Sequence, residues 1–190
     1  MPMTTVWLAL GSNLGDRDAA LALALRGLEE REGIVVVECS TVYETDAVGP
    51  GEQLPYLNAV VRIETELSPE LLLDCVQQIE QRAGREPAAG RARWAARTLD
   101  IDILFFGDTR IELPGLVVPH PRIAERSFVL VPLAAIAPDL VHPGHARTVA
   151  ALLDQLLEAP PGEAEGSLPP GIRPWERCRR IADASSSPRS

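Results

Sequence analysis

The chain has 190 residues, of which 46% are hydrophobic and 24% charged, a composition typical of one folded domain rather than of a disordered protein. Its formal net charge of −9 disfavours nonspecific binding to nucleic acid, and no apolar run approaches the ~20 residues of a membrane-spanning helix. All 18 basic residues are arginine, which excludes a Schiff-base lysine and a P-loop lysine, so any phosphate must be held by arginine, backbone amides or a metal ion.

The first half of the chain predicts alternating strands and helices. Asp16 and Ser68 stand where side chains cap the first turn of a helix, and the helix after Ser68 starts with a proline. In chain order, we expect a strand over 5–10, a turn over 11–15, a helix over 17–31, strands over 34–45 and 56–66, and a helix over 69–83. The buried face of this second helix is expected to consist of Leu71, Leu72, Val76 and Ile79.

The second half begins with a loop of small residues and arginines over 84–96. After it we expect a strand over 98–106, a hairpin returning through 109–113, a helical turn over 122–126, an extended stretch over 128–133 and, after a Thr148 cap, an amphipathic helix over 148–157. The order strand, helix, strand, strand, helix, strand is that of a ferredoxin-like α+β fold, in which helices pack on an antiparallel sheet.

The composition changes near residue 158. Residues 1–158 are expected to form the domain, whereas 159–190 are rich in Pro and Ser and predict a poorly ordered tail in which Trp175 could dock locally. Three cysteines at wide spacing form neither a closed disulfide set nor a CxxC motif, and residues 1–6 lack the pattern of a secretory signal. We therefore expect a cytoplasmic protein.

Two acidic residues alternate on the predicted strand 98–106. Because alternate residues of a strand point to one face, Asp100 and Asp102 project together from the sheet. The other face is expected to enter the core through Leu99, Ile101, Ile103 and Phe105. Adjacent carboxylates repel unless a cation lies between them, and Mg²⁺ binds one or two carboxylates together with phosphate oxygens and water. The alternative is an exposed strand face with two solvated acids.

A cluster of five arginines precedes the two aspartates, namely Arg82, Arg85, Arg91, Arg93 and Arg97. Such a cluster in an acidic chain is either an anion site or a solvated loop. Its position just before Asp100 and Asp102 favours the anion site, because carboxylates for a metal beside arginines for phosphate suit a metal–nucleotide complex.

Other candidates are less specific. His120 is held between two prolines, and Arg126 offers another phosphate contact. Tyr56 and Asn58 share one strand face, where a ring and a carboxamide can bind a flat heterocycle by stacking and hydrogen bonding. The glycine-containing turn 11–15 is either a site for an anion on backbone amides or only a tight turn.

Taken together, several motifs in this order resemble the 6-hydroxymethyl-7,8-dihydropterin pyrophosphokinases of folate biosynthesis. They are Gly-Ser-Asn-Leu-Gly at 11–15, Tyr-x-Thr at 43–45 leading to Tyr-Leu-Asn-Ala at 56–59, Ile-Glu at 79–80 with Gly-Arg at 84–85, Arg-Trp-x-x-Arg-Thr-Leu-Asp-Ile-Asp-Ile-Leu at 93–104, and Val-Pro-His at 118–120 with Arg-x-Phe-Val-Leu at 126–130. The resemblance covers roughly residues 5–157. It implies transfer of the β,γ-pyrophosphoryl group of ATP to the pterin hydroxymethyl group, with release of AMP.

The resemblance also implies partners and site residues. ATP and the pterin would be the substrates of a monomer that needs two Mg²⁺ ions, with neither nucleic acid nor a membrane as partner. Asp100 and Asp102 would bind the ions, and Arg85 and Arg97 would hold the triphosphate. The pterin-side residues would be Tyr56 and Phe128 on the two ring faces, Asn58 at the ring edge, Thr45 and Val48 beside it, and Trp94 on a closing loop. The residues bordering the nucleotide would be Gln77, Glu80, Ile103, His120 and Arg126.

The chain departs from the family pattern in the arginine-rich loop. The family usually has Gly-Pro between Trp94 and Arg97, where this chain has two alanines, and often a second arginine where Pro87 stands. Arg91 or Arg93 is expected to replace that arginine. No dedicated general base stands out, and Asp102 is one candidate. The alternatives to the enzyme are a noncatalytic ferredoxin-like module that binds nucleotide or metal, and another Asp-x-Asp metal enzyme such as a sugar-nucleotide transferase.

Overall fold

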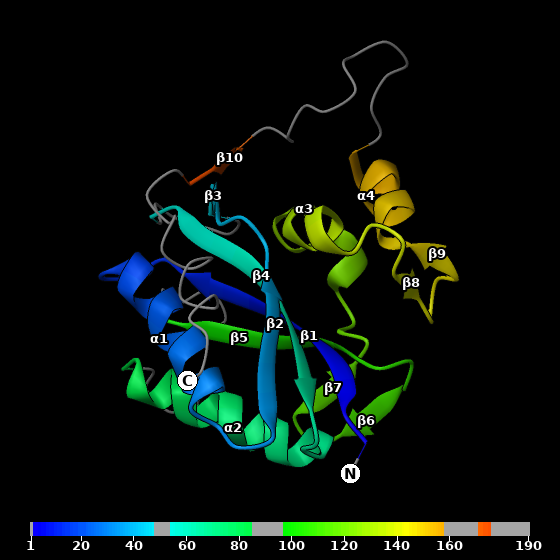
Figure 1. The fold of residues 1–190 in the computed structure, drawn as a ribbon. Coiled ribbons are helices and arrows are strands. Elements are labelled where there is room, and N and C mark those ends of the chain that lie inside the picture. Colours follow the sequence, from blue (N-terminus) through cyan, green and yellow to red (C-terminus); the bar gives the residue numbers. More distant parts are fainter. Residues whose placement is uncertain (1, 48–53, 85–96, 158–170, 176–190) are drawn as a thin grey trace.

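The computed structural model describes residues 2–47, 54–84, 97–157 and 171–175 (Figure 1). In chain order its elements are β1 (Thr4–Ser12), α1 (Arg17–Glu29), β2 (Ile34–Cys39), β3 (Tyr43–Thr45), β4 (Tyr56–Thr65), α2 (Pro69–Arg82), β5 (Asp100–Phe106), β6 (Ile111–Leu113), β7 (Leu116–Val118), the 3-10 turn η1 (Ile123–Glu125), α3 (Ser127–Ile136), β8 (Val141–His142), β9 (Arg147–Thr148), α4 (Val149–Leu157) and β10 (Ile172–Pro174).

The main sheet is antiparallel throughout. Its strand order is β10-β3-β4-β1-β5, and β2 pairs with the other end of β4. The elements β1, α1, β2 with β3, β4, α2 and β5 reproduce the predicted ferredoxin-like order, so the predicted α+β fold is confirmed. The described helices are too short or too polar to span a bilayer.

The sheet separates two hydrophobic cores (Figure 1). On one face, α1 and α2 pack against β1, β4 and β5, as the strand side chains Leu8, Val61 and Ile101 show. On the opposite face, α3 and α4 pack against Trp7, Val60 and Phe105. Because both faces are covered, the ends of the strands are left as the place where polar side chains can gather.

The predicted helix caps are confirmed. The Asp16 carboxylate accepts a hydrogen bond from the Ala19 amide at 3.0 Å, and the Ser68 hydroxyl accepts one from the Leu71 amide at 3.3 Å. The Thr148 hydroxyl does the same for the first turn of α4, at 3.1 Å from the amide nitrogen of Ala151. One predicted buried position is wrong, because Leu71 is 49% exposed and Cys75 takes the place in the core.

The predicted strand 34–45 is broken into β2 and β3. At the break, the Ser40 amide donates to the Val60 carbonyl, and the Ser40 hydroxyl accepts from the Val60 amide, both at 2.9 Å. A side-chain oxygen thus replaces a backbone carbonyl as acceptor in the pairing with β4. The regular pairing of β2 ends there, and β3 begins as a separate strand.

One prediction for the second half is confirmed in part, and one is wrong. The predicted turn at 107–108 is confirmed by an antiparallel bridge between Phe106 and Thr109, but the chain does not return further along β5. Instead β6 pairs with β7 across the left-handed turn residue Gly115, at φ +81°. Residues 128–133 are helical, not extended, although Pro132 lies inside α3. An apolar run without period reads the same for a buried strand and a buried helix, and packing against Trp7 and Phe105 decides for the helix.

Part of the predicted tail also belongs to the fold. Residues Ile172–Pro174 form β10 on the edge of the main sheet, beside β3. The expectation of a poorly ordered tail is therefore wrong for residues 171–175. The rest of 159–190 lies outside the described residues, and the domain boundary at 158 stays a prediction.

Candidate active site

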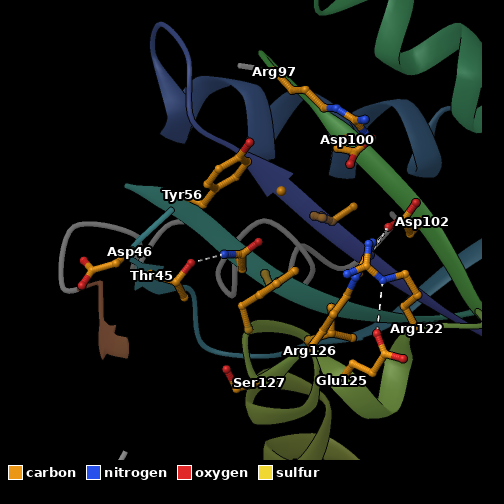
Figure 2. Close-up of a pocket in the computed structure, with 17 residues that line it drawn as sticks. Thr45, Asp46, Tyr56, Arg97, Asp100, Asp102, Arg122, Glu125, Arg126 and Ser127 are labelled. Atoms are coloured by element: carbon orange, nitrogen blue, oxygen red, sulfur yellow. Dashed lines mark hydrogen bonds and ion pairs between the residues drawn. The ribbon is translucent and has the colours of Figure 1, made fainter. Parts of the chain in front are cut away.

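The two aspartates of β5 lie as the alternation predicts. Asp100 and Asp102 both line a pocket at the end of the sheet (Figure 2). In contrast, Leu99, Ile101 and Ile103 are buried in the core under α2. The prediction that Phe105 shares this core face is wrong. A register shift between β1 and β5 turns it into the opposite core, against α3.

Arginines face each carboxylate at this end of the pocket. The Arg97 guanidinium forms an ion pair with Asp100, and Arg126 Nη1 lies 3.2 Å from Asp102 Oδ2. His120 Nε2 is 3.9 Å from the same oxygen, too far for a hydrogen bond. Figure 2 shows Arg97 and Arg126 on opposite sides of the pocket, so cations approach the aspartates from two sides.

Burial sets the electrostatics of the pair. The pKa of Asp102 is raised, chiefly by burial and then by the negative charge of Asp100, while His120 and Arg126 act against the rise. The pKa of His120 is lowered, also chiefly by burial. His120 Nδ1 accepts a hydrogen bond from the Arg122 amide at 3.2 Å, which suits a neutral ring with its proton on Nε2. A cation placed between the two carboxylates would oppose both causes of the raised Asp102 pKa and favour the charged form of the pair.

The other end of the pocket is lined by aromatic and neutral polar side chains. Asn58 Nδ2 donates to Thr45 Oγ1 at 2.7 Å, and both residues are buried. Tyr56 and Phe128 line the same pocket, and burial raises the pKa of the Tyr56 phenol, so the ring stays neutral. A Cβ at Gly11 would come within 3.3 Å of Asn58 Oδ1, which explains a glycine at this point of β1.

Asn13, at the end of β1, holds the backbone of Arg97. Its side-chain oxygen accepts a hydrogen bond from the Arg97 backbone amide at 2.7 Å, and its backbone amide donates one to the Arg97 carbonyl at 3.0 Å. Because the Asn13 backbone amide donates to Arg97, it is not free to bind an anion. The turn 11–15 instead supports the backbone of Arg97. Asn13 is buried, and the motif 11–15 carries no signal for this role, because Arg97 is distant in the sequence.

The structure does not bring all predicted site residues together. Glu80 is buried under β5, where its carboxylate accepts from the Ile101 amide at 2.8 Å. Ile103 is a core residue and Gln77 is exposed on α2, so neither lines the described pocket. Val48, Arg85 and Trp94 lie outside the described residues, as do Pro87, Arg91 and Arg93.

Several pocket residues were not predicted. Arg122 directly precedes η1, Glu125 ends it, and Ser127 begins α3. Asp46 follows β3. Arg122 Nε lies 3.3 Å from Glu125 Oε2. The spacing of three between these opposite charges, in a segment predicted as a helical turn, was the available signal.

A model of the 7,8-dihydro-6-hydroxymethylpterin-pyrophosphokinase family matches residues 7–138. This range includes every residue that lines the described pocket. The chain belongs to this family. Membership makes it an enzyme of folate biosynthesis, a pyrophosphokinase, and does not favour the noncatalytic binding module considered above.

Relatives named 2-amino-4-hydroxy-6-hydroxymethyldihydropteridine pyrophosphokinase support the membership. The Bacillus subtilis protein is 47% identical over 130 residues, which are 68% of this chain and 76% of that protein. The Pseudomonas aeruginosa protein is 41% identical over 164 residues, 86% of this chain and 96% of that one.

Solved structures support the fold. A crystal structure of Plasmodium falciparum HPPK-DHPS with STZ-DHP superposes with a TM-score of 0.63 at 15% identity and covers 82% of this pyrophosphokinase. The chain spans only 46% of that protein, so the likeness concerns the fold of the shared part alone.

Proposed function

We propose that the pocket between β5 and α3 is where this pyrophosphokinase transfers the pyrophosphoryl group of ATP to 6-hydroxymethyl-7,8-dihydropterin. The observation that carries the proposal is the pairing of Asp100 and Asp102 with Arg97 and Arg126 at one end of a pocket whose other end holds Tyr56 and Asn58. Charged phosphates and a flat neutral ring need these two different environments.

The carboxylates suit magnesium. Among the described residues, no group of three or more His, Cys, Asp or Glu side chains is arranged to hold a metal. Mg²⁺ nevertheless needs only one or two carboxylates, because phosphate oxygens and water complete its coordination. Asp100 and Asp102 fit that requirement, and we propose that they hold two ions. The ions would neutralise phosphate charge and align the β-phosphorus for in-line attack.

The arginines would bind the phosphates. Arg97 is fixed at its backbone by Asn13 and at its side chain by Asp100, so its guanidinium is set before ATP arrives. Arg126 lies opposite, and its guanidinium carbon is 5.6 Å from the centre of the Phe128 ring. Preorganised cations stabilise the charge of a transferring phosphoryl group without having to move during reaction. Arg85 is proposed to join them.

The pterin would occupy the end of the pocket near β3. Its ring would lie between Tyr56 and Phe128, with the Asn58 side chain oriented by Thr45 to hydrogen-bond the ring edge. Val48 and Trp94 keep their proposed places beside the ring. Four residues that do not line the described pocket stay proposed neighbours of the part of the nucleotide that lies beyond it, namely Gln77, Glu80, Ile103 and His120.

The reaction forms a bond between the pterin hydroxymethyl oxygen and the β-phosphorus of ATP, and breaks the bond from that phosphorus to the oxygen that leaves with AMP. The hydroxyl proton must be taken up by a base. Asp102 is the candidate, because its carboxylate lines the charged end of the pocket. We further propose that the enzyme is a monomer in the cytoplasm.

Separation of the adenine nucleotides tests the reaction. The purified chain is incubated with ATP, Mg²⁺ and the pterin, with and without excess EDTA. The proposal predicts AMP formed in proportion to added pterin, and none with EDTA. Formation of ADP would contradict the position of attack, and nucleotide that is bound but unchanged would favour a regulatory module.

A further inference from the structure

The described residues of the C-terminal tail lie against the pterin end of the pocket. We call residues 171–175 the C-terminal clamp. In it, β10 pairs with β3 so that Ile172 is opposite Thr45, and the Gly171 carbonyl accepts a hydrogen bond from the Asp46 amide at 2.9 Å. Both Thr45 and Asp46 line the pocket. The clamp lies outside the part of the chain that the family model matches, residues 7–138.

Arg173 connects the clamp to β3 by charge. Its guanidinium contacts Glu44 Oε2 at 2.7 Å and Asp46 Oδ1 at 3.3 Å. Glu44 also pairs with Arg17 at 3.0 Å, and Arg17 donates to the Pro55 carbonyl at 2.7 Å, next to Tyr56. A continuous set of charge-assisted contacts therefore runs from the clamp through β3 and α1 to the start of β4.

Apolar contacts connect the clamp to the opposite wall. Ile172 is buried in one cluster with Tyr43 of β3 and Val131 of α3. Trp175 donates from Nε1 to Asp18 Oδ1 at 2.9 Å, and the guanidinium of Arg17 lies 5.0 Å from the centre of its ring. Since α3 also carries Phe128, the clamp contacts the element that supplies one proposed face of the pterin site.

Gly171 allows the closest approach. It has φ +78°, and a Cβ built on it would meet Asp46 Oδ2 at 2.8 Å, nearer than real side chains come. The backbone of the clamp thus lies directly against a residue of the pocket lining, and Asp46 is bracketed by Gly171 and Arg173 (Figure 2 shows Asp46 beside Thr45).

We propose that the C-terminal clamp consists of positioning residues that hold β3 and Asp46 in the geometry that binds the pterin. This inference rests on the proposed function, because it assigns the Thr45 end of the pocket to the pterin. The proposed role differs from that of a purely structural edge strand. Such a strand would add stability to the fold, and its loss would not weaken the binding of one substrate more than that of the other. The nucleotide end, at Asp100 and Asp102, is not contacted by the clamp residues in any described hydrogen bond or ion pair.

Steady-state kinetics of full-length variants test the clamp. Gly171→Ala places a methyl group against Asp46, whereas Gly115→Ala has the same backbone strain, at φ +81°, with its nearest atom 4.0 Å away and far from the pocket. We expect Gly171→Ala to raise the KM for the pterin about tenfold, with the KM for ATP and kcat within about twofold of wild type. Gly115→Ala should leave all three unchanged.

A second pair of variants covers the case in which Gly171→Ala does not fold. Arg173 is 49% exposed at its side chain, so Arg173→Ala leaves the core intact and removes only the link to Glu44 and Asp46. We expect the same selective rise in the pterin KM, with recovery in Arg173→Lys. Wild-type kinetics in Arg173→Ala, or equal changes in both KM values, would overturn the clamp alone. A wild-type enzyme that makes no pterin-dependent AMP would overturn the proposed function and with it the assignment of the clamp to the pterin.

Discussion

Thr45 and Asn58 are a buried polar pair, and in the proposed site their geometry would orient the edge of the pterin. Asn58 Nδ2 lies 2.7 Å from Thr45 Oγ1, and Gly11 leaves room for Asn58 Oδ1 on the other side. One amide hydrogen is thus committed to Thr45, so the carboxamide cannot flip without breaking this bond. The orientation of the Asn58 side chain is fixed before substrate binds.

Replacing Thr45 by valine keeps the shape of the side chain and removes the acceptor. The buried Asn58 amide then loses a partner, at a cost of about 1–3 kcal/mol, which corresponds to a rise of roughly 5- to 150-fold in the pterin KM. Thr45→Ser restores the hydroxyl and should restore the KM. Thr41→Val, at an exposed position outside the pocket, is the matched control. A wild-type pterin KM in Thr45→Val would show that this pair does not orient the substrate.

At the residue scale, the sequence predicts side chains whose position follows from the period of a strand. Asp100 and Asp102 alternate with buried apolar residues, so their common face could be predicted. Asn13 and Asp46 could not be predicted, because their roles depend on backbone atoms of Arg97 and Gly171 that only the fold brings near.

At the element scale, α2 fixes the strand that carries both aspartates. The Glu80 carboxylate accepts a hydrogen bond at 2.8 Å from the amide of Ile101, the residue between Asp100 and Asp102. The interaction crosses from a helix to a strand in the core under the sheet, opposite the pocket. It therefore sets the backbone from which the two carboxylates project.

Glu80→Ala should weaken both stability and turnover. It leaves the Ile101 amide without this acceptor in the core, which costs about 1–3 kcal/mol of unfolding free energy. Glu80→Gln keeps an acceptor oxygen and should lose less, and Gln78→Ala, on the exposed face of α2, should stay within about 0.5 kcal/mol of wild type. Urea unfolding measures the free energies, and equal values for Glu80→Ala and wild type would refute this role.

The elements that were predicted well have local signals. Capping residues fix the starts of α1, α2 and α4. The elements that were predicted wrongly depend on distant partners. In α3, the apolar run fits a strand or a buried helix until its packing against β1 and β5 is known. The pairing of β6 with β7, by contrast, has a local signal that the prediction did not use, the Gly115 turn between the two strands.

At the scale of the whole molecule, the sheet lies between two cores, and the tail returns to its edge. Arg173 and Asp46 are 127 residues apart in sequence, so no local pattern could have predicted β10. The composition of the tail predicts disorder, and only the contacts of Ile172 and Trp175 with distant elements override it.

The stability of the whole domain should depend on pH through His142. This ring is buried against Phe105, and its Nδ1 accepts from the Gly144 amide at 3.0 Å, which requires an unprotonated Nδ1. Burial lowers its pKa from 6.5. Because the unfolded chain then binds more protons, the unfolding free energy is fully present above pH 6.5 and falls as pH drops below it, by at most about 1.4 kcal/mol per pH unit for one proton.

The His142→Asn variant removes this titration and keeps an acceptor oxygen near the turn. Its unfolding free energy should therefore fall less steeply between pH 7 and 5 (the buried His120 contributes equally to both proteins). His145→Asn, at an exposed position, should keep most of the wild-type slope. Identical slopes for wild type and His142→Asn, measured by urea unfolding across pH, would contradict the assignment.

The rate of pterin-dependent AMP release in aspartate variants tests most directly whether the β5 pair carries the reaction. Asp100→Asn and Asp102→Asn keep the side-chain shape and remove one negative charge each, and Asp108→Asn, at an exposed position just beyond β5, is the control. We predict that each pair variant loses at least about a hundredfold in turnover at saturating ATP and pterin, while the control stays near wild type. Near-wild-type turnover in both pair variants would contradict the account.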